Sequence, residues 1–231
     1  MAEELAPILP VLLRADPAPY LRRQPVCRLS PEGESGIAAE SVAPMPGAFR
    51  DRLLPGRGLD EAPALAGQLR LQLELRMLAG VARPEWLASP RPLHLSLSVA
   101  ALTSDAFLAL DGRLPRAVRP VLTLAVPVAE VLADPSGFAL GRDLAVSRGY
   151  VLALEAVCGE ALSLLDPARL GAQVVRLAWH DALPANPPPA AILRDLSVVI
   201  TGADRAAAIA WGWENGITLF QGRATDRHLR R

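Results

Sequence analysis

Lysine is absent from this chain of 231 residues, and histidine and cysteine are scarce, with three and two copies. Without a lysine amine, Schiff-base catalysis and a phosphate-binding loop of the GxxxxGK[ST] type are excluded. The two cysteines, Cys27 and Cys158, are too few for a disulfide framework or a zinc site of their own. This low cysteine content fits a reducing compartment.

The chain also lacks an excess of charge of either sign and any long hydrophobic run. Twenty-four arginines balance 24 acidic residues, which argues against broad binding to nucleic acid, since that requires a basic face. No apolar run reaches the roughly 20 residues that span a bilayer, and the acidic, proline-interrupted start does not resemble a secretory signal. We therefore expect a cytoplasmic protein that binds neither nucleic acid nor membranes.

What the chain does contain is apolar residues, which make up 51% of it and exclude disorder throughout. Short apolar segments predict strands, and several are apolar on both faces, as in parallel sheets covered by helices. The first two flank a polar turn and predict a hairpin. The expected strands are residues 24–29, 36–42, 93–99, 121–128, 150–157, 174–179, 196–201 and 217–221.

Helices are expected between most of these strands. The clearest covers Leu59 to Gly80, where leucines and a methionine recur every four residues, although alternating polar residues leave a strand as the alternative. Further helices are expected at residues 104–110, 134–149, 160–165 and 203–215. Prolines and glycines predict a loop from Pro44 to Gly58, and the run Pro184–Pro189 predicts an extended linker in place of a crossover helix.

The alternation of helices and strands from Leu59 onward predicts an α/β fold, a modified TIM-type (β/α) barrel. Its first strand pair is atypical, and its crossover near Pro184–Pro189 is shortened. A doubly wound open sheet is the alternative, but it favours a glycine-rich phosphate loop and no GxGxxG pattern is present. In a barrel, functional residues gather at the C-terminal ends of the strands.

Seven segments occur in the order of motifs known from one family. They are QPV (24–26), GIAAESV (36–42), LSLSVAALTSDAF (95–107), LTLAVPVAEVLADP (122–135), GYVLALEAVCGEALSLL (149–165), VVRLAW (174–179) and VVITGADRAAAIAWGWENGITLFQG (198–222). Together they resemble the EAL domain family, the bacterial cyclic-di-GMP phosphodiesterases. The resemblance implies an EAL-like barrel at residues 24–223, an N-terminal arm or lead-in helix at 1–23 and a basic C-terminal tail at 224–231.

The resemblance implies hydrolysis by two Mg²⁺ or Mn²⁺ ions, but this chain departs from the family at most ligand positions. Glu40 and Glu155 retain carboxylates, Gln221 is kept, and Arg176 stands at the lysine position. The other positions hold Pro44, Ser96, Ala125, Ala156, Ala178, Thr201 and the shortened carboxylate Asp204. We therefore expect a degenerate domain with no bound metal and no catalytic residues.

Glu40, Glu155, Arg176 and Gln221 remain as a vestigial ligand-binding set. A purely structural alternative is that Glu40 and Glu155 each pair with Arg176 across the barrel mouth.

Three functions follow from this interpretation. The first is a catalytically inactive module that regulates bacterial signalling through a protein partner or as a homodimer, with residues 157–165 as its contact. The second is a cyclic-di-GMP receptor that does not hydrolyse its ligand, although Pro44 replaces a phosphate-binding arginine. The third is an active phosphodiesterase. An apolar surface patch would favour the first, and an open, arginine-lined barrel mouth would favour the second.

Overall fold

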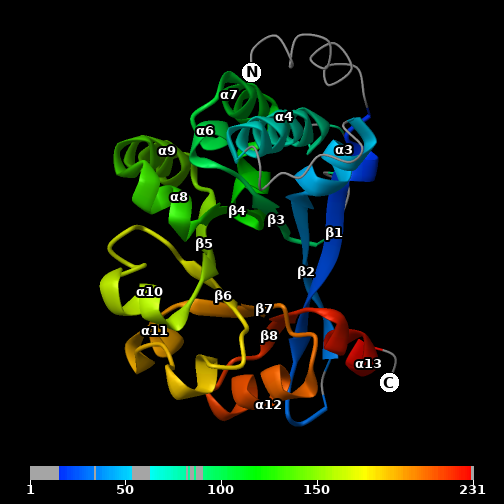
Figure 1. The fold of residues 1–231 in the computed structure, drawn as a ribbon. Coiled ribbons are helices and arrows are strands. Elements are labelled where there is room, and N and C mark those ends of the chain that lie inside the picture. Colours follow the sequence, from blue (N-terminus) through cyan, green and yellow to red (C-terminus); the bar gives the residue numbers. More distant parts are fainter. Residues whose placement is uncertain are drawn as a thin grey trace.

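A computed structural model describes residues 16–33, 35–53, 63–81, 83, 86 and 91–229. Eight strands close into a barrel in sequential order (Figure 1). β1 runs antiparallel to both of its neighbours, β2 and β8, whereas the pairs from β2 to β8 are parallel. The strands are β1 (Leu21–Leu29), β2 (Ser35–Pro44), β3 (Leu93–Ser96), β4 (Leu122–Pro127), β5 (Val151–Val157), β6 (Val174–Ala178), β7 (Ser197–Thr201) and β8 (Leu219–Gln221). The predicted barrel with an atypical first strand pair is confirmed.

Helices surround the ring of strands (Figure 1). The α-helices are α3 (Pro46–Leu53), α4 (Pro63–Val81), α6 (Val99–Leu102), α7 (Asp105–Arg113), α8 (Val128–Ala133), α9 (Pro135–Arg148), α10 (Gly159–Leu164), α11 (Ala190–Asp195), α12 (Ala206–Glu214) and α13 (Asp226–Leu229). Short 3₁₀ turns are η1 (Ala18–Tyr20), η2 (Arg116–Val121), η3 (Leu183–Ala185) and η4 (Arg223–Thr225). No helix among these described residues is long and apolar enough to cross a membrane.

Local sequence signals account for several of these boundaries. Ser104 caps α7 by accepting a hydrogen bond from the Phe107 amide at 3.2 Å, and Asp134 caps α9 in the same way. Gly149 ends α9 in the left-handed conformation, with a φ of 87°. In α4, the residues at four-residue spacing, Leu69, Leu73 and Met77, are fully buried, so the helix predicted there is confirmed.

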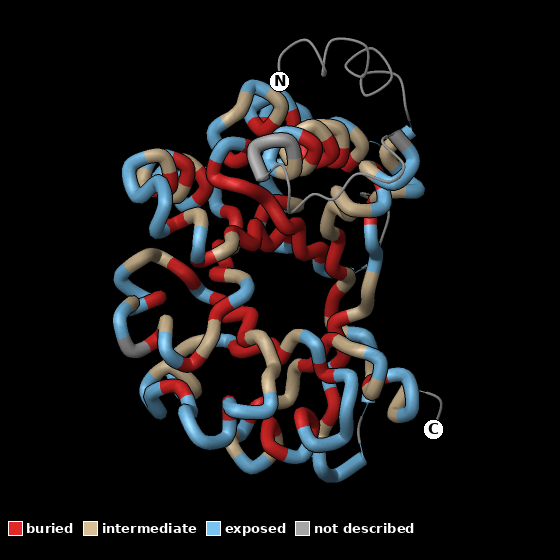
Figure 2. The backbone as a smooth tube through the Cα atoms, in the orientation of Figure 1, coloured by how far each residue is buried: buried red, intermediate tan, exposed pale blue. Residues whose placement is uncertain are grey.

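Successive residues of each strand face opposite sides of the barrel wall. Outward-facing residues such as Leu124 and Val126 join the large apolar core beneath the helices. Most residues of β3 to β8 are buried, whereas most of β1 and β2 are exposed or intermediate (Figure 2). A second, small cluster fills part of the interior with compact side chains: Val26, Ala39, Ala125, Ala153, Val174 and Val199. These small residues leave room for larger polar side chains closer to the strand ends.

Three expectations about local structure are wrong. The loop predicted over Pro44–Gly58 contains α3, because a proline at the first helical position lacks only an amide that needs no helical partner; residues 54–58 lie outside the described part. The strand predicted over residues 93–99 ends at Ser96, because Ser98 caps α6. The linker at residues 184–189 is not wholly extended, since η3 overlaps it and the short helix α11 follows directly.

The two ends of the expected barrel domain continue into ordered structure. β1 begins at Leu21, three residues before the expected start, while residues 1–15 of the expected arm lie outside the described part. After β8, the chain forms η4 and α13. The Ser35 hydroxyl donates a hydrogen bond to the His228 carbonyl oxygen at 2.9 Å, which links α13 to the start of β2.

Candidate functional site

A cavity of about 480 Å³ lies at the C-terminal ends of the parallel strands. β1 runs antiparallel to its neighbours β2 and β8, so its N-terminal residues lie at the end of the barrel where the parallel strands have their C-termini, and they contribute to the lining. The volume is within the range typical of small-molecule sites. Its ionisable and amide-bearing lining residues are Arg22, Gln24, Arg70, Glu155, Arg176, Asp204 and Gln221.

Arg176 on β6 lies at the base of this cavity and is 2% exposed. One terminal guanidinium nitrogen donates to Ser41 Oγ at 3.1 Å and to Gln221 Oε1 at 2.5 Å. The other lies 3.1 Å from His94 Nδ1, and Nε lies 3.4 Å from the Glu155 carboxylate. Side chains from β2, β3, β5 and β8 therefore converge on one buried cation.

The protonation of His94 follows from this contact. Burial, together with the positive charge of Arg176, lowers the pKa of His94 to about 3. The ring is therefore neutral at physiological pH, and Nδ1 accepts a hydrogen bond from the guanidinium, which can only donate. Burial also lowers the pKa of Arg176, while the Glu155 carboxylate opposes this effect.

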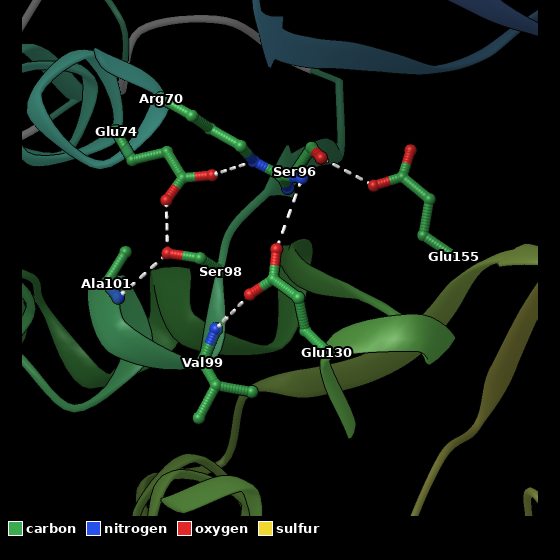
Figure 3. Close-up of polar contacts among 8 residues, drawn as sticks. All are labelled: Arg70, Glu74, Ser96, Ser98, Val99, Ala101, Glu130 and Glu155. Atoms are coloured by element: carbon green, nitrogen blue, oxygen red, sulfur yellow. Dashed lines mark hydrogen bonds and ion pairs between the residues drawn. The ribbon is translucent and has the colours of Figure 1, made fainter. Parts of the chain in front are cut away.

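Glu155 lies near the end of β5, and its carboxylate contacts both Arg176 and Ser96. Its carboxylate accepts a hydrogen bond from Ser96 Oγ at 2.5 Å (Figure 3). The next residue, Ala156, has a φ of 54°, and the pairing of β5 with β6 is irregular between Leu154 and Val157. Alanine rarely adopts this left-handed conformation, and such strain is often found at functional sites.

A second polar network reaches the cavity from outside the barrel (Figure 3). Arg70 on α4 lines the cavity, and its Nε lies 2.7 Å from the fully buried carboxylate of Glu74. A terminal nitrogen of Arg70 lies 3.2 Å from Glu130 on α8. Glu74 also accepts a hydrogen bond from Ser98 Oγ, and Glu130 accepts one from the Val99 amide at 2.9 Å. The network thus joins α4, α6 and α8 behind one cavity-lining guanidinium.

The structure brings together three of the four residues predicted for the site. Glu155, Arg176 and Gln221 line the cavity, and the Glu155–Arg176 pair is present. Glu40 does not line it; its carboxylate lies 3.5 Å from Arg23, with the Glu40 side chain 31% exposed. The expected pair between Glu40 and Arg176 is therefore wrong.

The reason is the two-residue period of a strand, in which a shift of one position reverses the face. Ser41, the next residue of β2, faces the interior and contacts Arg176. Sequence reasoning also missed three polar side chains of the lining: Arg22, Gln24 and Arg70. Arg22 and Gln24 alternate with the interior residue Val26 and could have been found by that spacing. Arg70 had no comparable signal, because its position depends on how α4 packs.

The lining does not suit the pair of divalent cations that the family resemblance implies. At the mouth, Ser96, Ala178 and Thr201 provide no carboxylate, and Asp204 is occupied by the Arg223 amide and guanidinium at 2.8 and 3.0 Å. Among the described residues, no three His, Cys, Asp or Glu side chains gather as metal ligands. One carboxylate beside a guanidinium cannot neutralise two hard cations.

Glu74 supplies a prediction about pH. Burial raises the pKa of this carboxyl, although Arg70 and Ser98 oppose the effect. A folded-state pKa above the unfolded value gives stability that is present at low pH and lost as the pH rises through the folded value. Replacing Glu74 with glutamine removes that loss. The free energy of unfolding of the variant, relative to that of the parent protein, should therefore be higher at pH 7 than at about pH 4.5.

Urea unfolding of the variant and of the parent protein, at about pH 4.5 and at pH 7, measures this difference in the free energy of unfolding. Glu160→Gln is the matched control, since it makes the same chemical change at an exposed position. A Glu74→Gln variant whose stability relative to the parent protein falls as the pH rises would contradict the prediction.

No protein-family profile and no curated protein sequence matches the chain. Among solved structures, Vibrio cholerae LapD (S helix-GGDEF-EAL, bound to c-di-GMP) superposes with a TM-score of 0.66 at 13% identity, over 96% of this chain and 57% of that one. The Xanthomonas citri FimX EAL domain in complex with c-di-GMP superposes with a TM-score of 0.61 at 12% identity, over 96% of this chain and 93% of that one. Klebsiella pneumoniae BlrP1, as a manganese/c-di-GMP complex, superposes with a TM-score of 0.56 at 17% identity, over 87% of this chain and 54% of that one. The chain spans little more than half of LapD and BlrP1 but nearly all of the FimX domain, and its fold is that of an EAL domain.

Proposed function

We propose that this chain is a non-catalytic regulatory module of bacterial signalling whose barrel mouth binds cyclic-di-GMP without hydrolysing it. The observation that carries the proposal is Arg176, a buried guanidinium at the base of a preformed cavity, surrounded by Ser41, His94, Glu155 and Gln221. The structural relatives LapD and FimX are described as bound to c-di-GMP, which supports the choice of ligand.

The chemistry of the lining favours binding over hydrolysis. Two-metal hydrolysis needs cations that lower the pKa of a bound water and stabilise the attacking and leaving oxygens. A guanidinium stays protonated and activates no water. The nitrogens of Arg176 already face Ser41, His94, Gln221 and Glu155, so this residue would attract a phosphate through its charge. Arg176 therefore supplies a built-in positive charge at the site, and ligand binding there should not require a divalent cation.

Further positive charge lies at the rim of the cavity. Arg22 lines the mouth from β1, and no carboxylate partner of its side chain is found in the described part of the chain. An arginine without an anionic partner is free to pair with a phosphate group. The cavity is thus lined by arginines from two strands and from α4. This arrangement favours a nucleotide receptor, the second of the functions expected from the sequence.

Isothermal titration with cyclic-di-GMP, with and without Mg²⁺, tests the proposal. We expect binding with a micromolar or tighter dissociation constant in both buffers, and the nucleotide should be recovered intact after prolonged incubation. Absence of heat in both buffers would refute receptor function. Binding only with Mg²⁺, followed by appearance of the linear dinucleotide, would show a phosphodiesterase instead.

A protein-interaction module, alone or as a homodimer, is the second candidate. Large apolar side chains are exposed on three helices beside the barrel: Leu132 on α8 (59%), Leu140 on α9 (67%) and Leu164 on α10 (87%). These side chains would mark a contact surface if they form one contiguous patch, since apolar residues exposed singly are common on monomers. Sedimentation analysis of the purified chain distinguishes a stable homodimer, which would support this candidate, from a monomer.

A further inference from the structure

The side chain of Arg70 reaches the barrel mouth from a helix outside the barrel. It comes from α4, yet it lines the same cavity as Arg176 and Gln221, and its side chain is 27% exposed. Glu74 and Glu130, the two carboxylates that hold it, do not line the cavity. The guanidinium therefore contacts both carboxylates, as Figure 3 shows, and also lines the cavity.

The two supports use only part of the donor capacity of the guanidinium. Nε faces Glu74 and one terminal nitrogen faces Glu130. A guanidinium carries five N–H donors, and among the described residues no contact of the second terminal nitrogen is found, so we take it to be available to a ligand. It is the fork-like geometry of arginine that suits phosphate oxygens.

The supports are themselves held in place. Glu74 is fully buried and accepts a hydrogen bond from Ser98 Oγ, while Glu130 accepts one from the Val99 amide at 2.9 Å. Arg70 is thus ordered before any ligand arrives, and binding need not immobilise a long, flexible side chain at that moment.

We propose that Arg70 is an anchor for a phosphate group of the ligand at the barrel mouth. The inference rests on the proposed binding function, and it names the ligand chemistry as a phosphate or phosphodiester. Inorganic pyrophosphate and cyclic-di-GMP share that chemistry, so both serve as probes.

The test uses the double substitution Arg70→Gln and Glu74→Gln in the full chain. Replacing both partners avoids leaving the buried Glu74 carboxylate without its cation. The matched control is Arg169→Gln, since the Arg169 side chain is 89% exposed and its one ion pair among the described residues is with Asp166, three positions earlier. We expect the double variant to bind both probes about tenfold more weakly or worse, as loss of a charge-assisted hydrogen bond implies, and the control to bind like the parent protein.

The outcomes separate this inference from the proposed function. Unchanged binding of cyclic-di-GMP by the double variant would overturn the role of Arg70 and leave receptor function intact. Binding of pyrophosphate alone, lost in the double variant, would support Arg70 and refute the cyclic-di-GMP receptor. Failure of the parent protein to bind either probe would overturn both.

A second variant covers the case in which the double variant does not fold. Arg70→Lys keeps a positive charge beside Glu74 but loses the planar fork. It should weaken binding several-fold while the melting temperature stays close to that of the parent protein. Parent-like affinity in Arg70→Lys would overturn the proposal.

Discussion

Replacing Arg176 with methionine should lower the free energy of unfolding by about 3–4 kcal/mol and abolish ligand binding at the barrel mouth. Methionine keeps most of the unbranched stem but removes every polar contact of the guanidinium. Ser41, His94 and Gln221 would each lose a buried partner, and Glu155 would lose the cation 3.4 Å away. Buried polar groups left without partners carry the full cost of their desolvation.

Urea unfolding followed by circular dichroism measures the stability change, and titration with cyclic-di-GMP measures the binding change. Arg169→Gln is again the control, because an exposed pair of this kind contributes little to stability. If Arg176→Met were as stable as the parent protein, the interior network would not be held by this cation. If it bound ligand with parent affinity, the site would lie elsewhere.

Arg176 also accounts for how the interior of this barrel is filled. Small residues such as Ala125 and Ala153 line the interior beneath the mouth. A guanidinium on β6 crosses this space and finds acceptors on β2, β3 and β8. The neutral state of His94 matters here, since a protonated imidazole would repel Arg176 and could not accept its hydrogen bond. Stability and, under the proposed function, ligand binding therefore depend on the same side chain.

The barrel could be predicted because its signals are local and repeated along the chain. Apolar strand segments, the four-residue spacing in α4 and the caps Ser104 and Asp134 all act over a few residues. The order of the motifs then placed Glu155, Arg176 and Gln221 at one end of the barrel, and all three line the cavity.

The rest of the site depends on geometry that motif spacing does not contain. Glu40 and Ser41 are adjacent in β2, and only the pairing register decides which of them faces the interior. Arg70 enters the cavity because α4 packs against the barrel at one rotation, which the periodic leucines alone do not specify. The helix α3 likewise forms in a segment whose prolines and glycines favour a loop.

The substitution Gly222→Ala should lower the free energy of unfolding by about 2–4 kcal/mol, because an added Cβ would collide with backbone rather than with a movable side chain. Gly222 follows β8 with a φ of 157°, and a Cβ there would lie 2.4–2.5 Å from the backbone N, C and O atoms of Ala203. The Ala203 amide donates to the Gln221 carbonyl oxygen at 2.9 Å, and its carbonyl accepts from the Ala224 amide at 3.0 Å. Relieving the clash would break these hydrogen bonds.

Gly112→Ala is the matched control, because Gly112 lies in α7 with nothing within 4 Å of the added Cβ. That change should leave stability unchanged or raise it by up to about 1 kcal/mol, as expected for alanine over glycine in a helix. Urea unfolding of both variants measures the contrast. The close approach at Gly222 also fixes Gln221, whose side chain accepts from Arg176, so Gly222→Ala should weaken ligand binding as well. Parent-like stability in Gly222→Ala would mean that the barrel end adjusts without cost and that Gln221 is positioned by its side-chain contacts alone.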